Sequence, residues 1–429
     1  RVIAISQMET TGARHTFPCF DEPAFKATFD FTLYHRSDQG FYAVANMPPI
    51  MFQTEMIDTV LWNSTTFDTT YVMSTYLLAV TVSDFLYEPA TSTAGSPTTI
   101  FLIPKSGELS FFENICKTAD NCHVIAITFF QLYQMAVADF GAGAMENWGL
   151  VLYRETLLLF DENISSVHDK YSITQVIGHE LGHQWFGNLV TCAWWNEIWL
   201  NEGFASYVQY IAVDGVKPEY KPWEIFIIDD LQIALSADAY SNSHPLVHPE
   251  GRFSSITYSK KYILDLVVPS IYADLGWDDS NTSDSALITR YSIDAACTYG
   301  NQDCIDNAVM LFDQWRNDTT TIISSTYRTD VFCTAIREGG LAEWDFAWEQ
   351  YLLSQNAQFQ SSLRYGLSCS KDAWVLNRYL EYAMDPTKVR KQDIQNTFSY
   401  IARQEYGKYT AWAFAMNNWD RVINQYVVS

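Results

Sequence analysis

The chain has 429 residues, 48 % of them hydrophobic, so it is long enough for two or three domains and is not a disordered protein. Its formal net charge is −24, and so acidic a surface repels phosphate backbones and anionic lipid. Nucleic-acid binding and membrane docking through a basic patch are therefore excluded. The sequence also has no run of about 18 uninterrupted apolar residues that would span a bilayer.

The first part of the chain, up to about Leu86, is predicted to be mainly β structure. Short β-prone runs at Phe29–Leu33 and Phe41–Ala45 are bounded by Asp, Gly and Pro, and the longer run Tyr71–Val82 is rich in Val, Thr and Tyr. The turn-rich stretch Glu88–Pro97 follows and predicts a domain boundary.

Helical periodicity is strongest further along the chain, first at Ile173–Val190 and Glu202–Val213. Beyond Tyr262 the pattern is repeatedly helical, with Gly, Asn, Asp and Pro between the helical segments, as in stacked helical hairpins. These later helices are predicted at Ala308–Trp315, Thr329–Glu338, Trp344–Leu353, Trp374–Met384 and Lys391–Glu405.

The eight cysteines are either buried free thiols or disulfides, and four glycosylation sequons favour disulfides. The sequons begin at Asn63, Asn163, Asn281 and Asn317. Cys297 and Cys304 bracket a polar turn that can bring them together, and local disulfides of this kind form where the compartment is oxidising. We therefore expect a secreted or extracellular glycoprotein.

The segment Gly178–Phe186 carries the pattern His-Glu-x-x-His. His179 and His183 are four residues apart, so on a helix they share a face and can point two imidazoles at one cation. Glu180 lies one step round the helix, where it can reach a water on that cation but not the cation itself. The alternative is two surface histidines with this spacing by accident.

A third ligand strengthens the metal interpretation. Eighteen residues separate His183 from Glu202, whose carboxylate completes a His₂Glu set if it lies on a following antiparallel helix. Three protein ligands with one open position are typical of catalytic zinc, whereas structural zinc uses four. Cys192 stands alone near the histidines, so a thiolate site does not fit. We expect one zinc ion per chain on His179, His183 and Glu202, with Glu180 as general base.

A second motif, Gly143-Ala144-Met145-Glu146-Asn147, precedes the first. Together the two motifs resemble the zinc aminopeptidases of the aminopeptidase N family, which are gluzincins with an HExxH pattern, a distant glutamate and a GAMEN motif. The resemblance implies that this second motif binds substrate and that Glu146 holds its free α-amine. A fixed carboxylate near zinc would select charged N-termini and so restrict cleavage to one residue at a time. The alternative for Glu146 is an ordinary acid in a turn.

Two further segments are similar to parts of the same family. Ser6-Gln7-Met8-Glu9 resembles the segment whose glutamine helps to hold the amine, which implies that role for Gln7. Ile256–Lys260 resembles the segment with the tyrosine that stabilises the oxyanion, here Tyr258. A phenol suits this role because it donates a hydrogen bond without bringing a full charge.

The family resemblance extends to the helical C-terminal part, where it pairs Cys297 with Cys304 and Cys333 with Cys369. The remaining cysteines are assigned from their surroundings. Cys19 and Cys192 lie in Phe-rich and Trp-rich segments and are expected to be free and buried, whereas Cys116 and Cys122 are expected to form a bond.

The implied fold is an α+β multidomain protein with a partial β-rich N-terminal domain at 1–88, a thermolysin-like zinc catalytic domain at 89–260 and a partial α-helical C-terminal domain at 261–429. The chain departs from the family pattern at Lys261, which stands where the family has a glycine. From that residue the sequence already resembles the middle of the helical domain. The rest of the catalytic domain and a small β-sandwich are missing between the two blocks, and Arg1 falls late in the family's N-terminal domain.

The resemblance implies a zinc aminopeptidase that releases single N-terminal residues from peptides with a free N-terminus. It also implies a cell-surface location, with a membrane anchor in the full-length protein, and a homodimer through the helical domain. The alternative is a cell-surface binding or receptor protein that keeps the fold but has lost efficient turnover. The intact metal and substrate-binding motifs favour the enzyme, since a receptor does not need them.

Overall fold

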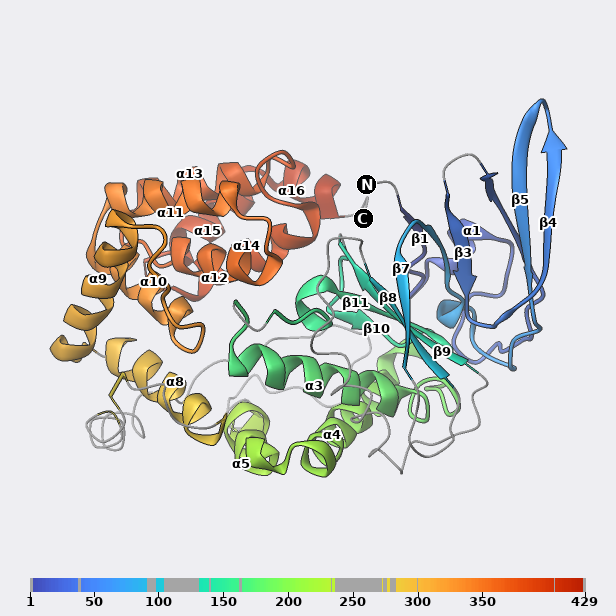
Figure 1. The fold of residues 1–429 in the computed structure, drawn as a ribbon, viewed down its shortest axis with the longest axis horizontal. Coiled ribbons are helices and arrows are strands. Elements are labelled where there is room, and N and C mark those ends of the chain that lie inside the picture. The colour runs from blue at the N-terminus through green and yellow to red at the C-terminus, as the bar shows by residue number, and fades with distance from the viewer. Residues whose placement is uncertain are drawn as a thin grey trace. The chain divides into compact units, whose positions relative to one another are not determined.

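The computed structural model describes the chain except for residues 1–2, 38–39, 91–97, 104–130, 139, 162–163, 233, 236–271, 273–275, 278–282, 299, 405 and 427–429. The chain forms two compact units (Figure 1). The first unit comprises residues 1–138, 142–160 and 171–258, and the second comprises 139–141, 161–170 and 259–429. None of the described helices has the length and apolar character needed to cross a membrane. The division into three domains with boundaries at 88 and 260 stays a prediction.

The first unit begins with two antiparallel sheets, each of three described strands. One has the order β1 (Ala4–Ile5), β6 (Val80–Ser83), β3 (Tyr42–Ala45), and the other has the order β2 (Thr32–Arg36), β5 (Val60–Phe67), β4 (Pro49–Ile57). The short helix α1 (Ala13–Thr16) lies between β1 and β2 in the sequence. The predicted β character of this region is confirmed, although only the end of the run Tyr71–Val82 becomes a strand, because its middle forms a helical turn at Thr75–Leu77.

A five-stranded mixed sheet follows, with β7 and β10 at its edges. It has the order β10 (Ala144–Met145), β11 (Leu150–Arg154), β9 (Gln131–Val137), β8 (Thr98–Ile103), β7 (Leu86–Ala90). The three central strands run parallel, and each edge strand pairs antiparallel with its neighbour. The motif Gly143–Asn147 therefore supplies an edge strand of this sheet.

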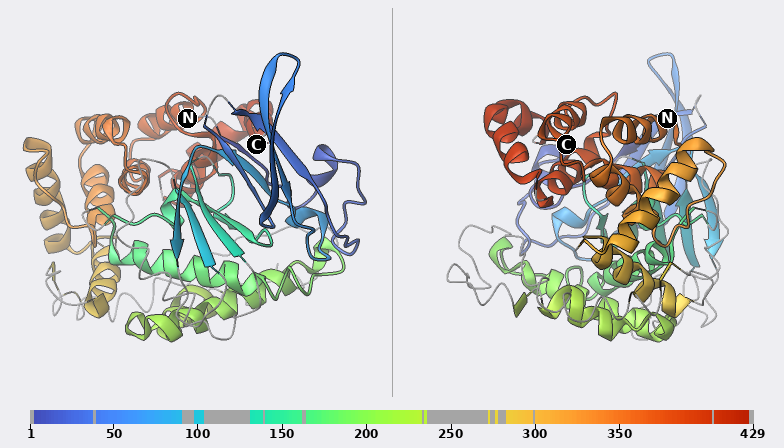
Figure 2. Two further views of the ribbon diagram at one scale, coloured as in Figure 1. Left: turned by 45° about the vertical axis from the view of Figure 1, so that its right-hand side comes forward. Right: turned by 90° about the vertical axis from the view of Figure 1, so that its left-hand side faces the viewer.

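Helix α3 (Val167–His183) packs on this sheet, and in Figure 2 it lies with α4 (Trp199–Val216) beneath the strands. Ile173, Ile177 and Leu181 are spaced by four residues, so they share a face of α3, and they pack against side chains of β9 and β11. Each fully buried side chain of this kind contributes about 1.5–3 kcal/mol. The opposite side of α3 is therefore left for the polar residues of the motif.

Close packing of α3 on α4 depends on a glycine. A Cβ atom added at Gly178 would lie 2.8 Å from the Cβ of Ala212 and 3.3 Å from the Cα of Gln209. The glycine thus allows α3 and α4 to pack closely enough for side chains of the two helices to meet. Helix α5 (Pro222–Phe226) and the π-helix Ile227–Leu231 follow α4 in the sequence.

Helix α3 begins before the predicted window Ile173–Val190, at Val167, and ends before it, at His183. It ends at His183 because the chain then turns back, with the Asn188 amide donating to the His183 carbonyl oxygen at 3.0 Å and Gly187 at a φ of +135°. This conformation favours glycine. The helix therefore ends directly after the second histidine of the motif.

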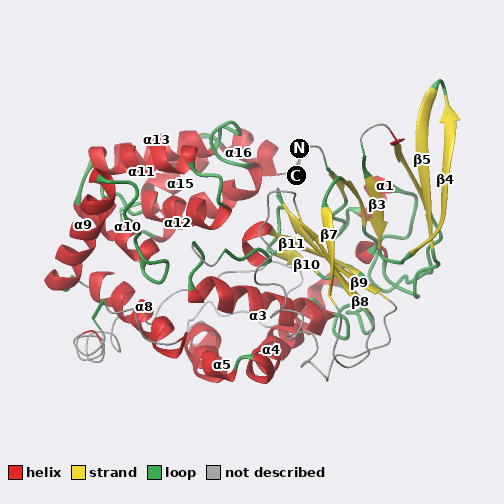
Figure 3. Ribbon diagram, viewed as in Figure 1, coloured by secondary structure: helices red, strands yellow, loops and turns green. Residues whose placement is uncertain are grey.

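The described part of the second unit is almost entirely helical (Figure 3). Its helices are α8 (Ser283–Thr298), α9 (Gln302–Asn317), α10 (Arg328–Glu338), α11 (Leu341–Leu353), α12 (Ala357–Leu367), α13 (Ala373–Ala383), α14 (Ile394–Arg403), α15 (Lys408–Asn417) and α16 (Trp419–Tyr426). The first three windows predicted beyond Tyr262 fall in α9, α10 and α11, and Trp374–Met384 matches α13 to within one residue. The window Lys391–Glu405 begins with the 3-10 turn Lys391–Asp393 and continues as α14, and Glu405 lies outside the described residues. The side chains of Asn301, Asn356 and Asp372 cap the starts of α9, α12 and α13.

Two disulfides, Cys297–Cys304 and Cys333–Cys369, join residues of the second unit and confirm both predicted pairs. Cys192 is free and buried, as predicted. Cys19 is free but only partly buried, so the prediction for its burial is wrong. It lies in a surface turn next to Phe20, whose side chain is 80 % exposed, because this Phe-rich segment does not enter the core. Cys116 and Cys122 lie outside the described residues.

The two disulfides should differ in their contribution to stability. Replacing both Cys333 and Cys369 by alanine should lower the free energy of unfolding by about 4 kcal/mol, against about 2.5 kcal/mol for the pair Cys297 and Cys304. The reason is the loop that each bond closes in the unfolded chain, with a sequence separation of 36 against 7 residues. Denaturant unfolding of the full chain measures both values. A larger loss from the shorter loop would contradict this account.

Candidate active site

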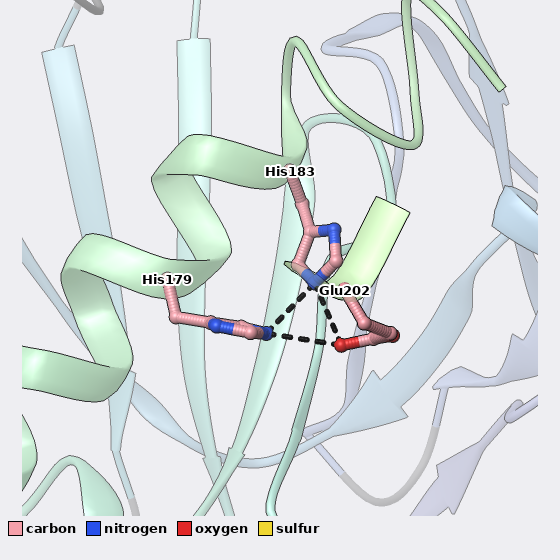
Figure 4. Close-up of side chains that lie close together, drawn as sticks. All are labelled: His179, His183 and Glu202. Atoms are coloured by element: carbon pink, nitrogen blue, oxygen red, sulfur yellow. Dashed lines mark hydrogen bonds and ion pairs between the residues drawn. The ribbon is translucent and has the colours of Figure 1, made fainter. Parts of the chain in front are cut away.

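Three side chains of the first unit converge where α3 ends and α4 begins. The Nε2 atoms of His179 and His183 are 2.9 Å apart, and Glu202 Oε2 lies 3.2 Å from the first and 3.5 Å from the second. Figure 4 shows the two imidazoles on successive turns of α3 facing the carboxylate from α4. Among the described residues, this triad has the donor atoms and spacing to hold a metal ion.

The outer nitrogens of both imidazoles are already engaged. His183 Nδ1 lies 2.9 Å from the Phe186 carbonyl oxygen, which only accepts, so Nδ1 carries a hydrogen. His179 Nδ1 lies 3.2 Å from Gln209 Oε1 on α4. Both arrangements leave the two Nε2 atoms directed at each other and at Glu202 Oε2, which is the arrangement of two imidazoles and a carboxylate that share one cation. Outer partners of this kind orient histidines that bind metals.

The charges around the triad also fit a cation. Burial alone would lower the pKa of His183, but the carboxylates of Glu146, Glu202 and Glu180 outweigh it and raise this pKa to about 10. Burial would raise the pKa of Glu202, yet hydrogen bonds with the two histidines and their charges hold it well below the usual range. The site therefore concentrates negative charge around the two imidazoles.

Glu180 lies between the two histidines on α3 and is 5 % exposed. Burial raises the pKa of its carboxyl group well above the usual value, with His183 opposing and Glu146 reinforcing the shift. Its Oε2 atom is buried and has no hydrogen-bond partner within the described part of the chain. A buried acceptor without a partner is costly, so this oxygen is available for a ligand or water.

Glu146 follows the edge strand β10 and is 4 % exposed, with its Oε1 atom 4.0 Å from His183 Nδ1. It is therefore a buried carboxylate beside the triad rather than an acid in a surface turn. Gly143 and the strand residues Ala144 and Met145 lead up to it, and the Gly143 carbonyl oxygen accepts a hydrogen bond from the Arg154 amide at 2.9 Å. The whole motif is thus attached to β11.

Sequence reasoning did not select Glu9, a partly buried acid on which the charges of Glu146 and Glu202 act. Burial, reinforced by the negative charges of Glu146 and Glu202, raises its pKa to about 8. Gln7 was selected instead, but it is exposed, and its amide Nε2 lies 3.3 Å from Met145 Sδ. The available signal was a carboxylate two positions after Gln7 in the same segment. Tyr258, the predicted oxyanion donor, lies outside the described residues.

The N-terminal strands hold the loops of the site in place. Asn46 is 2 % exposed, donates to the carbonyl oxygens of Trp148 at 2.9 Å and Leu77 at 2.8 Å, and accepts from the Ala79 amide. A Cβ atom at Gly149 would lie 2.0 Å from the Asn46 carbonyl oxygen, and Gly149 has a φ of +94°, so only glycine fits there. The segment that carries Glu146 is thereby fixed on both sides.

The loop after α3 is held in the same way. The Lys26 ammonium group donates to the carbonyl oxygens of Asn188 at 3.1 Å and Leu189 at 3.0 Å, and the Tyr76 hydroxyl donates to the Gly187 carbonyl oxygen at 3.3 Å. The Asn188 side chain in turn donates to the Glu146 carbonyl oxygen at 2.8 Å. This network positions Glu146 relative to the histidines.

Three family models match the chain. They are the Peptidase M1 N-terminal domain at residues 1–77, the Peptidase family M1 domain at 109–279 and the ERAP1-like C-terminal domain at 251–428. Aminopeptidase Ey of Gallus gallus is 27 % identical over 696 aligned positions, and aminopeptidase N of Homo sapiens is 26 % identical over 691, each covering 99 % of this chain and 71 % of the relative. Glutamyl aminopeptidase of Sus scrofa is 38 % identical over 270 positions, which cover 60 % of this chain and 28 % of the relative.

This fold and this site define a metal-dependent peptidase. The chain belongs to the M1 family of aminopeptidases. The alignment with aminopeptidase Ey is longer than the 429 residues of the chain, so that relative contains internal segments with no counterpart here.

Proposed function

We propose that this protein is a zinc-dependent aminopeptidase that releases single residues from the free N-termini of peptides. The observation that carries the proposal is the convergence of a His₂Glu triad able to hold a metal with the buried carboxylates of Glu146 and Glu180. His179, His183 and Glu202 would hold the ion, and bound zinc lowers the pKa of water towards about 7 and polarises a carbonyl group.

Glu180 acts as the general base. Its unpartnered buried Oε2 atom accepts the proton of the attacking water, and the same carboxyl group then delivers this proton to the departing amine. Tyr258 donates a hydrogen bond to the oxyanion that develops on the scissile carbonyl. The assignment of Tyr258 comes from the resemblance to the family alone.

Glu146 and Glu9 hold the substrate's α-ammonium group. An unperturbed α-ammonium has a pKa of about 7.7–8.0, so most of it is charged near neutral pH and needs a fixed partner in a buried site. The Glu146 carboxylate supplies that charge, Glu9 adds a second carboxyl group, and Gln7 adds a neutral amide next to Met145. Because β10 is the edge strand of the sheet that the described residues form, a substrate backbone can pair along it. The distance from Glu146 to the triad then limits cleavage to the first peptide bond.

A comparison of substrates tests this function. We expect hydrolysis of aminoacyl substrates with a free amine and almost none of their N-acetylated forms, because acetylation removes the charge that Glu146 binds. Glu146→Gln should lower kcat/KM by about 30-fold to several thousand-fold, which corresponds to roughly 2–5 kcal/mol for a buried charge that loses its partner. Comparable rates on both substrate forms would mean an endopeptidase or another hydrolase.

A matched control separates a local effect from general damage. Glu55 is an exposed glutamate on β4, and Glu55→Gln should leave kcat/KM unchanged. Metal content should be the same in both variants. If Glu146→Gln loses its metal together with activity, Glu146 supports the triad rather than the substrate.

A second candidate function is a surface binding protein on the same fold. The internal segments that aminopeptidase Ey has and this chain lacks favour it. Turnover by the purified, metal-loaded chain decides between the two, because a pure binding protein would show none. For location we propose the extracellular space or cell surface, which the two disulfides support. A homodimer through the helical region stays a prediction from the resemblance.

A further inference from the structure

We propose that Asn317, in the sequon Asn317-Asp318-Thr319, carries an N-linked glycan. Asn317 is the last residue of α9 and is exposed, as are Asp318 and Thr319. The chain leaves the helix at Asp318 in an extended conformation, with φ −142° and ψ 100°. The acceptor amide therefore lies on the surface at the point where the chain turns away from the helix.

The turn after α9 does not use the side chains that glycosylation requires. Asp318 Oδ1 accepts hydrogen bonds from the Thr320 amide at 3.0 Å and its hydroxyl at 2.6 Å, and the Asp318 carbonyl oxygen accepts from the Thr321 amide at 2.9 Å. The side chains of Asn317 and Thr319 form no hydrogen bond with any residue that the structure describes. Both remain available for the transferase that reads the sequon.

The base of the sequon is firmly held. Arg316, which precedes Asn317, forms an ion pair with Asp313 at 2.9 Å and another with Glu343 at the start of α11. A glycan on Asn317 would thus extend from a fixed helix end into solvent and would displace no packed side chain.

The sequon at Asn63 lies within a sheet rather than at an exposed helix end. Asn63 lies in β5, the central strand of its sheet, and its Oδ1 atom accepts a hydrogen bond from Thr54 Oγ1 at 2.9 Å. Ser64 and Thr65 are 4 % and 0 % exposed. The hydroxyl group of Thr65, the third residue of this sequon, is therefore buried in a central strand, and we assign no glycan to Asn63. Asn163 and Asn281 lie outside the described residues.

The disulfides place the same unit in a compartment where this modification occurs. Cys297, Cys304, Cys333 and Cys369 are all at most 8 % exposed and are paired, which requires an oxidising compartment such as the secretory pathway. The donor there is an oligosaccharide linked to a lipid pyrophosphate. The Asn317 Nδ2 atom bonds to C1 of the first sugar of this oligosaccharide. The bond between C1 and the oxygen of the lipid pyrophosphate breaks, and the amide nitrogen loses one proton.

Site mapping on the full chain, secreted from eukaryotic cells, tests the proposal. Digestion with peptide-N-glycosidase in ¹⁸O-water converts a glycosylated asparagine into a labelled aspartate, which peptide mass spectrometry locates. We expect the label at Asn317 and none at Asn63. An unlabelled, intact Asn317 in secreted protein with both disulfides formed would overturn the proposal.

Variants give a second readout on the intact protein. Asn317→Gln and Thr319→Ala should each remove the mass of one glycan, whereas Asn63→Gln should remove none. Thr321→Ala is the matched control, because it replaces a threonine of the same turn that is not part of the sequon, and it should keep the glycan. An unchanged mass in both Asn317→Gln and Thr319→Ala would contradict the assignment. These outcomes do not depend on peptidase activity.

Discussion

Glu180→Gln is expected to abolish peptide hydrolysis, with a loss in kcat on the order of 10²–10⁴, while the metal stays bound. Glutamine keeps the volume of the buried side chain but cannot accept and return a proton. His179 and His183 share one face of α3, which leaves Glu180 one step round the helix and outside the ligand set. The amide should therefore remove the general base and leave the triad intact.

Two measurements on the same preparation check this expectation. Steady-state rates on a free-amine aminoacyl substrate give kcat, and elemental analysis gives metal per chain. Glu224→Gln is a suitable control, because Glu224 is an exposed glutamate on α5, away from the triad, and its replacement should change neither value. If Glu180→Gln loses metal along with activity, Glu180 is a ligand or a structural acid and the proposed base lies elsewhere.

His179→Ala should reduce the metal content from about one ion per chain to almost none and should abolish activity with it. A catalytic zinc site keeps three protein ligands, so removing one leaves two and an incomplete set. The His179 side chain is 18 % exposed, against 2 % for His183, so alanine at this position disturbs the core less and keeps the experiment interpretable. Full metal content and full activity in His179→Ala would refute the triad.

A weaker variant makes the metal test quantitative. Gln209 Oε1 contacts His179 Nδ1, the ring nitrogen that faces away from the triad. Gln209→Ala should therefore lower metal affinity by about 10–100-fold without removing a ligand. Competition with a chelator measures both affinities. His15→Ala, which replaces an exposed histidine of α1, should leave the affinity unchanged. Equal losses in the Gln209 and His15 variants would mean that the contact behind His179 has no role in metal binding.

The triad was predictable because helical periodicity is a local property. Four residues of α-helix bring His179 and His183 to one face regardless of what surrounds the helix, and the pattern that predicts the helix is local as well. The position of Glu202 is not a local property, since the distance from Glu202 to the two histidines depends on how α4 crosses α3. The spacing matched a known family, and the structure supplies the physical reason in the close contact at Gly178.

The boundaries of elements were less predictable than their existence. The run Ile173–Val190 is apolar enough to continue as a helix, but a left-handed glycine at position 187 and the return of the chain to His183 end it early. The middle of Tyr71–Val82 has the composition of a strand and forms a helical turn. Thr75 and Tyr76 are buried there against Asp21 and Trp195, and tertiary contacts override the local preference.

By itself the sequence determined the β-then-helical organisation, the helix that carries His179 and His183, and the local disulfide Cys297–Cys304, because each depends on residues close together in the chain. Only the tertiary structure decided that Gln7 contacts Met145, that Asn46 holds the loop after Glu146, and that the outer nitrogens of the two histidines are occupied. These features depend on contacts between segments far apart in the chain, such as Gln7 with Met145, which are 138 residues apart. Such contacts form only when burial brings distant segments together, and no local pattern encodes which partner a side chain will meet.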